Sequence, residues 1–309
     1  PNILVSRCLG FDACRYDGAM VEAPFVQAMR PYAKLLTVCP EVEIGMGIPR
    51  DPIRIVQTPG GRKKLYQPAT GHTLTRQMKT HVRQRLAELD AFDGVLLKSK
   101  SPSCGLGTCK LFESTAADAR VVGRTSGVLA AEIERQCPGV PASDEVKVVE
   151  SARREHWLTA VFTLAQFRRT ARYESAGSLK KFHEYHRSLL YAYNKSAVRE
   201  MDIIVGSARK REAGRALHQY GQQLIRCLQR PARAQAMVNA LQPAVEHYRQ
   251  YLTKQNLQRY DRLKKQVLAR QAAIADLRKL IQVWAVRYDK NFVREHALYR
   301  PYPQILADA

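Results

Sequence analysis

The sequence has no apolar run that approaches the roughly 18 residues of a membrane-spanning helix, so we expect no membrane association. It also lacks a charged leader before a long apolar core, so we expect no signal peptide and a cytoplasmic location. We find no fixed-period repeat and no low-complexity tract, and apolar residues make up 45%, which excludes a disordered chain. In a reducing compartment, the seven cysteines are not expected to form disulfides.

Acidic residues are scarce. The chain has 28 Asp and Glu against 50 Lys and Arg, which gives a formal net charge of +22. Residues 1–150 carry 20 basic and 16 acidic residues, a net charge of +4, whereas residues 151–309 carry 30 and 12, a net charge of +18. A field of this strength favours a polyanionic partner, most simply a nucleic acid.

Glycine, proline and cysteine are rare in the C-terminal half. The first 150 residues hold 13 of the 17 glycines, 11 of the 15 prolines and six of the seven cysteines. We therefore predict two domains. Residues 1–145 would form an α/β domain with a parallel sheet flanked by helices, and residues 146–309 an all-α helical bundle. We infer no obligate protein partner.

The order of elements follows from apolar runs and breakers. The runs 3–6, 35–38 and 94–98 are too short for helices and predict buried strands, whereas 23–33, 73–91 and 126–136 suit helices. This alternation favours a parallel sheet. In the second half, helical runs cover 146–173, 178–194, 196–229, 232–252 and 254–289, with breaks expected near Gly177, Arg230-Pro231 and Gln242-Pro243.

Three cysteines follow the three predicted strands. Cys8 and Cys39 come directly after the first two strands, and Cys104 lies in the loop after the third. Because sites in open parallel sheets form outside the carboxyl ends of the strands, these thiols would meet at one point. Such a set suits either zinc or a 4Fe–4S cluster with one open iron. Taken singly, each cysteine is as well explained as a small buried hydrophobe.

Polar residues lie beside these thiols. Glu41 follows Cys39 by two residues, and Ser101 precedes Cys104 by three. A carboxylate and a hydroxyl beside a Lewis acid are the groups needed to activate and relay water. The structural alternative is that Glu41 pairs with Arg50 and Ser101 caps a turn. Further candidates for a substrate pocket at the same edge are Arg15, Asp17, Lys98, Lys100 and Ser103.

Five short motifs, in this order, resemble the thiouracil desulfidase family over roughly residues 2–145. They are Cys8-Leu9-Gly10, Cys14-Arg15-Tyr16-Asp17-Gly18, Cys39-Pro40-Glu41-Val42, Gly47-Ile48-Pro49-Arg50 and Ser101-Pro102-Ser103-Cys104-Gly105. The remainder resembles the YbgA-type domain in the segment from Phe182-His183 to Tyr193-Asn194 and in the closing Pro301-Tyr302-Pro303. The composite is similar to the long desulfidases that remove sulfur from 4-thiouridine in tRNA.

The resemblance implies a non-redox, hydrolytic desulfidase. Its 4Fe–4S cluster would be held by Cys8, Cys39 and Cys104, with the fourth iron open to the substrate sulfur. The catalytic carboxylate falls on Glu41 and the catalytic serine on Ser101. The expected partner is tRNA carrying 4-thiouridine, which becomes uridine as sulfide leaves. Cys14 and Cys109 are not ligands by this mapping. The segment 43–47 departs from the glycine-rich pattern of the short members, which predicts a different substrate mouth.

The basic half supplies candidate RNA contacts, because phosphate binding depends on Lys and Arg. The candidates are Lys195, Arg199, Arg209, Lys210, Arg211 and Arg215. Charge runs of this kind also occur on ordinary solvated helix faces. Three other functions remain open: the same chemistry on free thiouracil or thionucleosides, a zinc-containing nucleic-acid-binding protein without catalysis, and a role on DNA.

Overall fold

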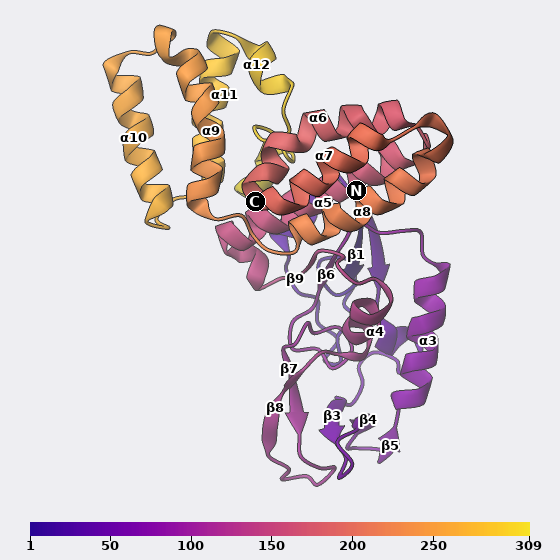
Figure 1. The fold of residues 1–309 in the computed structure, drawn as a ribbon. Coiled ribbons are helices and arrows are strands. Elements are labelled where there is room, and N and C mark those ends of the chain that lie inside the picture. Colours follow the sequence, from indigo (N-terminus) through magenta and orange to yellow (C-terminus); the bar gives the residue numbers. More distant parts are fainter. The chain divides into compact units, whose positions relative to one another are not determined.

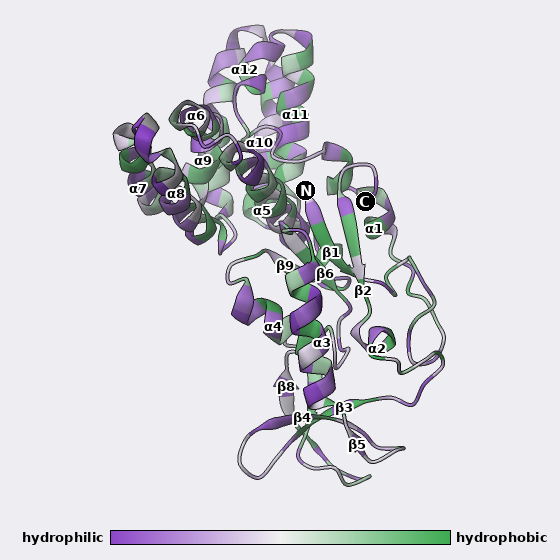
Figure 2. Ribbon diagram, turned by 90° about the vertical axis from the view of Figure 1, so that its right-hand side faces the viewer, coloured by the Kyte–Doolittle hydropathy of each residue, from purple (hydrophilic) through white to green (hydrophobic). Residues whose placement is uncertain are grey.

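The apolar runs predicted as strands form a parallel sheet in the computed structural model, which describes residues 1–309 except for the side chain of Lys210. The sheet has the order β2-β1-β6-β9, with β1 (Asn2–Ser6) between β2 (Lys34–Val38) and β6 (Gly94–Leu97), and β9 (Ala142–Asp144) at one edge. All four residues of β6 are buried, and β1 is hydrophobic over most of its length (Figure 2). Continuous apolar strands are typical of parallel sheets, because both of their faces are covered.

Helices accompany this sheet in the first unit of the chain, which comprises Pro1–Val149 with Ala309. They are α1 (Pro24–Met29), α2 (Pro40–Glu43), α3 (Thr75–Glu88) and α4 (Val128–Gln136), followed by a 3₁₀ turn, η1 (Lys147–Val149). Helix α3 buries Met78, Val82 and Leu86, which recur every four residues and so form one apolar face. The helix predicted over 23–33 is shorter than expected.

A second sheet, which the sequence patterns did not predict, lies in the same unit. Its order is β5-β4-β3-β7-β8, and every pairing in it is antiparallel except that of β3 with β7. The strands are β3 (Arg54–Gln57), β4 (Lys63–Gln67), β5 (His72–Thr73), β7 (Cys109–Phe112) and β8 (Val121–Thr125). They are short and rich in charge, so they lack the apolar runs that marked the first sheet.

The second unit, Glu150–Asp308, is helical, so the predicted fold class of an α/β region followed by an all-α region is confirmed. Its α-helices are α5 (Ser151–Ala171), α6 (Ala176–Tyr193), α7 (Lys195–Ser207), α8 (Ala213–Leu228), α9 (Ala234–Tyr248), α10 (Lys254–Leu268), α11 (Ile274–Arg287) and α12 (Lys290–Arg294). Short 3₁₀ turns η2 (Lys210–Glu212), η3 (Arg249–Tyr251) and η4 (Gln304–Ala307) complete it.

Some of the predicted helix breaks need correction. The break at Arg230-Pro231 is confirmed, but Pro243 lies inside α9, so the break predicted there is wrong. A proline removes one N–H and leaves the carbonyl four residues earlier without its helical partner. That residue is Asn239, which is exposed, so its carbonyl can face water. Gly177 lies in the first turn of α6, just after the break that it was expected to mark.

Figure 1 shows α5 to α8 in one group and α9 to α12 in another. The helices pack around two apolar clusters. Residues of α5, α6, α7 and α8 form one, and residues of α6, α9, α10, α11 and α12 form the other, so α6 belongs to both. A buried polar contact ties α5 to α11, since Arg278 pairs with Glu155, which also accepts a hydrogen bond from Tyr302. No helix among the described residues has the length and apolarity needed to span a membrane.

Candidate active site

Three thiols from three strand ends line one cavity in the first unit. Cys8 lies two residues beyond β1, Cys39 follows β2 directly, and Cys104 lies in the loop after β6. β1 pairs in parallel with both neighbours, so the three carboxyl ends share one edge of the sheet. The cavity has a volume of about 760 Å³, and all three cysteines line it. The structure therefore brings together the three residues that the strand-end argument predicted to meet.

Two of the three thiols, Cys8 and Cys104, have raised pKa values that favour the protonated form. Burial raises the pKa of Cys8 to about 11, and the neighbouring Cys39 adds to the increase. Burial also raises the pKa of Cys104 well above its ordinary value, although a hydrogen bond with Ser6 opposes it. A metal group binds thiolates, so it would displace protons from these side chains on binding.

The donor set fits a group that takes thiolate ligands. Among the described side chains, no three His, Cys, Asp or Glu lie close enough together to hold a metal ion between them. A tetrahedral zinc would need ligand sulfurs about 3.8 Å apart. An iron–sulfur cluster also takes cysteine thiolate ligands, so three thiols that line one cavity fit such a group as well.

Two further cysteines differ in their placement. Cys14 is buried and lines the same cavity, and its carbonyl oxygen lies 3.9 Å from Cys39 Sγ. Burial and the neighbouring Cys39 raise the Cys14 pKa to about 12. Cys109 does not line the cavity, and its Sγ donates to the Ser101 carbonyl at 2.8 Å. A side chain at Gly105 would place its Cβ 2.6 Å from that sulfur, so the Cys109 thiol and Gly105 together shape the loop of residues 101–105.

Glu41 lies on α2, two residues after Cys39, and both of its carboxylate oxygens have protein partners. Arg50 donates to Oε2 from Nε at 2.9 Å and from Nη2 at 2.8 Å. Ser103 Oγ donates to Oε1 at 2.8 Å. The pairing with Arg50 is the one that the structural alternative predicted, yet Glu41 also lines the cavity. The two Arg50 contacts occupy Oε2, but Oε1 has a single donor and a second lone pair, so the fixed carboxylate can still accept a proton there.

Arg50 is itself fixed, because its side chain is only 4% exposed. Nη1 donates to the Gly47 carbonyl and Nη2 to the Cys14 carbonyl, both at 3.0 Å. These bonds join three of the sequence motifs around Glu41.

Ser101 also lines the cavity and caps its own loop. Its Oγ accepts hydrogen bonds from the backbone N–H groups of Ser103 and Cys104, both at 3.2 Å. This is again the contact that the structural alternative predicted. A hydroxyl has two acceptor positions and one donor. Because the acceptor positions are used, the Ser101 hydroxyl can only donate toward a ligand in the cavity.

The predicted pocket residues divide into two groups. Arg15, Lys98 and Lys100 line the cavity, whereas Asp17 and Ser103 do not. Asp17 instead accepts from Arg15 at 3.0 Å, and Ser103 acts through Glu41.

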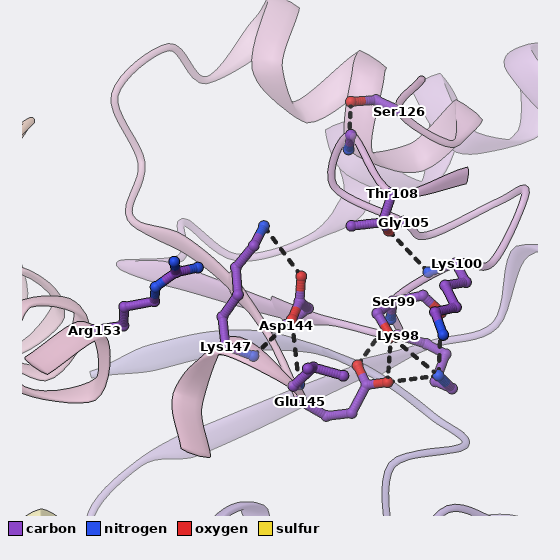
Figure 3. A network of polar contacts seen from close by, with 12 residues as sticks. Lys98, Ser99, Lys100, Gly105, Thr108, Ser126, Asp144, Glu145, Lys147 and Arg153 are labelled. Carbon is purple, nitrogen blue, oxygen red and sulfur yellow. Dashed lines mark hydrogen bonds and ion pairs between the residues drawn. The ribbon is translucent and has the colours of Figure 1, made fainter. Parts of the chain in front are cut away.

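Glu145 neutralises Lys98, with Oε1 2.5 Å from Nζ, and also accepts from the Ser99 N–H and hydroxyl (Figure 3). Burial opposes ionisation of Glu145, but the hydrogen bonds from Lys98 and Ser99 outweigh it and lower the pKa.

Sequence reasoning missed three basic cavity residues from the second sheet, Arg54, Lys110 and Arg124. Arg54 Nη2 donates to the carbonyls of Thr115 and Ala116 at 2.7 Å, and Arg124 Nη1 donates to the Thr108 carbonyl at 3.0 Å. None of the three has an acidic partner among the described residues. The only available signal was the alternation of buried and charged residues in 109–112, which predicts a strand but not its place beside the thiols.

The predicted RNA contacts all lie in the second unit. Lys195, Arg199, Arg209, Arg211 and Arg215 are exposed, and the side chain of Lys210 lies outside the described part of the chain. Of the five described side chains, only that of Lys195 lines the large groove of that unit, which has a volume of about 1410 Å³.

The chain resembles two known families. The family described as 2-thiouracil desulfurase matches residues 3–145, and DUF1722, a family of unknown function, matches residues 187–303. The uncharacterized protein YbbK of Bacillus subtilis (strain 168) is 33% identical over 141 residues, which cover 43% of this chain and 89% of YbbK. A solved structure, the [4Fe-4S]-dependent thiouracil desulfidase TudS, matches 48% of this chain and 93% of its own, with 24% identity and a TM-score of 0.38.

Proposed function

The chain belongs through residues 3–145 to the 2-thiouracil desulfurase family, and from this premise we propose that it hydrolyses 4-thiouridine in tRNA to uridine. In this reaction the thiocarbonyl C=S and one water give C=O and hydrogen sulfide, without a change of oxidation state. The observation that carries the proposal is the meeting of Cys8, Cys39, Cys104 and Glu41 at one cavity.

The proposed cofactor is a 4Fe–4S cluster. Cys8, Cys39 and Cys104 would hold it, with the fourth iron open to the sulfur of the substrate. When bound, such a cluster supplies a thiophilic Lewis acid that withdraws electron density from the thiocarbonyl carbon. Cys14, the fourth thiol of the cavity, remains outside this ligand set.

The protein supplies the proton transfers. The Glu41 carboxylate would accept a proton from the attacking water at Oε1, since Glu41 lines the cavity and this oxygen retains a free lone pair. Arg50 and Ser103 act as positioning residues, because they fix the two oxygens of Glu41. Ser101, whose hydroxyl is free to donate, would hold the water or the leaving sulfur.

The choice of tRNA over a free base rests on charge. A free thiopyrimidine is small and needs no basic domain, whereas residues 151–309 carry a net charge of +18. In that unit, a groove lies where α6 ends and where α7 and α9 begin, and Lys195, Arg226, Arg230 and Arg233 line it. None of these four cations has an acidic partner among the described residues. Cations of this kind bind phosphates.

The groove also suits bases. Tyr191 lines it with 39% of its surface exposed. Lys195 Nζ lies 5.2 Å from the centre of the Tyr191 ring, so a stacked base would be adjacent to a cation. Aromatic side chains of this kind stack on unpaired bases in RNA recognition. We therefore assign the groove, which we call the helical groove, to tRNA.

Nucleoside analysis tests the proposal. Anaerobically prepared protein with verified iron and sulfide content would be incubated with tRNA that contains 4-thiouridine, and the nucleosides would then be counted. We expect 4-thiouridine to become uridine with release of one sulfide, and no conversion by Cys104→Ala. Conversion of free 4-thiouracil but not of tRNA would favour the free-base alternative. No conversion of either by protein with an intact cluster would refute a desulfidase.

A further inference from the structure

Two cations face each other across the hairpin of the second sheet. Lys110 on β7 and Arg124 on β8 are direct partners in the antiparallel register. Their neighbours in β7, Cys109 and Leu111, are buried on the opposite face, so the alternation of the strand directs Lys110 away from the core. Both cations are exposed, and both line the cavity that holds the three thiols.

This arrangement is unfavourable for the fold alone. Like charges directly opposite each other in a sheet are destabilising. A nearby carboxylate would relieve the repulsion, yet neither Lys110 nor Arg124 has an ion pair among the described residues. Arg124 donates only to the carbonyl of Thr108, at 3.0 Å. The Lys110 amine has no hydrogen-bond partner in the described part of the chain.

A third cation reaches the same cavity from the loop that follows β6. Lys100 is exposed, lines the cavity and has no ion pair among the described residues. Its backbone N–H donates to Thr108 Oγ1 at 2.8 Å (Figure 3), so Thr108 anchors both Lys100 and Arg124. Lys100 also has a φ of 62°, a left-handed conformation that costs a residue with a side chain some free energy. Lys100, Lys110 and Arg124 form what we call the cationic rim.

A neutral base cannot compensate for this repulsion, but phosphate groups can. A nucleotide inside an RNA strand has one phosphodiester on each side, and each carries a negative charge. Arg binds phosphate through a planar fork of donors, and Lys binds it as a point charge. The rim lies on the same cavity as Glu41 and the thiols, so it can bind phosphates while the base is inside.

We propose that the cationic rim binds the phosphates that flank the thiolated nucleotide and thereby selects a nucleotide in a phosphodiester chain over a free base. This inference rests on the proposed desulfidase function. It adds a specificity site in the first unit, which does not depend on the helical groove.

The experiment compares Lys110→Gln/Arg124→Gln with a matched pair, Arg76→Gln/Lys79→Gln. The matched residues are an exposed Arg and Lys on α3 that do not line the cavity. The substrates are 4-thiouracil, 4-thiouridine 5′-monophosphate, and an oligoribonucleotide with one internal 4-thiouridine. A second oligonucleotide has neutral methylphosphonates on both sides of that residue. For each variant, the measured quantity is the ratio of kcat/KM for each phosphate-bearing substrate to kcat/KM for 4-thiouracil.

We expect this ratio for the charged oligonucleotide to fall at least about tenfold in the rim variant, mainly through KM, and less so at high salt. The matched pair should stay within about twofold of the wild type, because exposed charges away from the site contribute little. In the wild type, the methylphosphonate oligonucleotide should give a ratio as low as the one that the rim variant gives with the charged oligonucleotide. In the rim variant, the two oligonucleotides should give similar ratios. A smaller loss with the monophosphate would indicate that the rim binds a strand rather than a free nucleotide phosphate.

An unchanged ratio in the rim variant would overturn the inference and leave the desulfidase function intact. Inactivity of the wild type on every thiopyrimidine would instead overturn the function. The rim would then be tested by binding of a labelled, sulfur-free oligonucleotide, and equal affinities for the two variants would refute it. Thermal unfolding separates a folding defect from a binding defect. We expect the rim variant to melt at or above the wild-type temperature, since the substitutions remove a repulsion, and a lower melting temperature would count against the argument.

Discussion

Removal of Arg230 and Arg233 from the helical groove should weaken tRNA binding and reduce its dependence on salt. Both side chains are exposed, line the groove and have no acidic partner among the described residues. Arg233 is the N-cap residue of α9 but makes no side-chain cap, so Arg230→Ala/Arg233→Ala removes two charges and no helix-stabilising bond. The cost in stability should therefore stay within about 0.5 kcal/mol.

The expected change in the salt dependence of tRNA binding follows from counterion release. Each lost phosphate contact lowers the slope of log K against log salt by about 0.9, so two lost contacts lower it by about 1.8. Between about 50 mM and about 200 mM salt, the variant should lose about twelvefold less affinity than the wild type. Fluorescence anisotropy with a labelled tRNA transcript, measured at four salt concentrations, would give both slopes.

A matched variant shows whether position matters. Arg259 and Arg262 are exposed on α10 and do not line the groove. Arg259→Ala/Arg262→Ala removes the same charge, and we expect its slope to stay within about 0.5 of the wild-type value, because screening limits distant charges. Equal slopes for the two variants would refute a defined groove and would leave only a diffuse basic field.

Three further predictions concern the catalytic carboxylate, the buried ion pair and the response to acid. Glu41→Gln should lower turnover by about a hundredfold or more while the absorbance of the cluster persists; loss of both would give Glu41 a structural role. Arg278→Met should cost about 3–5 kcal/mol in urea unfolding, because it leaves the buried Glu155 carboxylate without its cation; a cost below about 1 kcal/mol would contradict a buried charge pair. Burial opposes ionisation of Glu132, but hydrogen bonds from Arg83, Arg135 and Gln136 outweigh it and lower its pKa from 4.5 to about 2. Ionised Glu132 should therefore add about 2 kcal/mol to the free energy of unfolding, after allowance for the exposed arginines. This contribution should be present above pH 4.5 and lost as the pH falls toward 2. Glu132→Gln should flatten that part of the stability curve, and an unchanged curve would mean that Glu132 does not contribute.

The sequence was sufficient to predict the meeting of the thiols. Parallel strands end at one edge, and each of the three apolar runs preceded a cysteine, so a local pattern indicated a long-range contact. The structural alternative for Glu41 and Ser101 also described real contacts, with Arg50 and with the loop backbone. The two interpretations therefore agree, since the contacts that stabilise the loop also orient the groups in the cavity.

The second sheet and its cations could not be predicted in the same way. β3 and β7 lie more than 50 residues apart in the chain, and both are four residues long. The pairing of Lys110 with Arg124 depends on a hairpin register that composition does not fix. The helical groove was missed for a related reason, because Arg226, Arg230 and Arg233 meet Lys195 only where the end of α8 and the start of α9 lie beside the start of α7.

The ion pair between Lys98 and Glu145 limits where the chain can be truncated or fused to another domain while the cavity stays intact. Glu145 follows the edge strand β9 directly and supplies the carboxylate that balances Lys98 in the cavity wall. A truncation after Gly139 would remove both the edge strand and this counter-charge, and it would leave an unbalanced ammonium group beside the thiols. The shortest transplantable catalytic module must therefore extend through Glu145, and a fusion joint belongs after that residue.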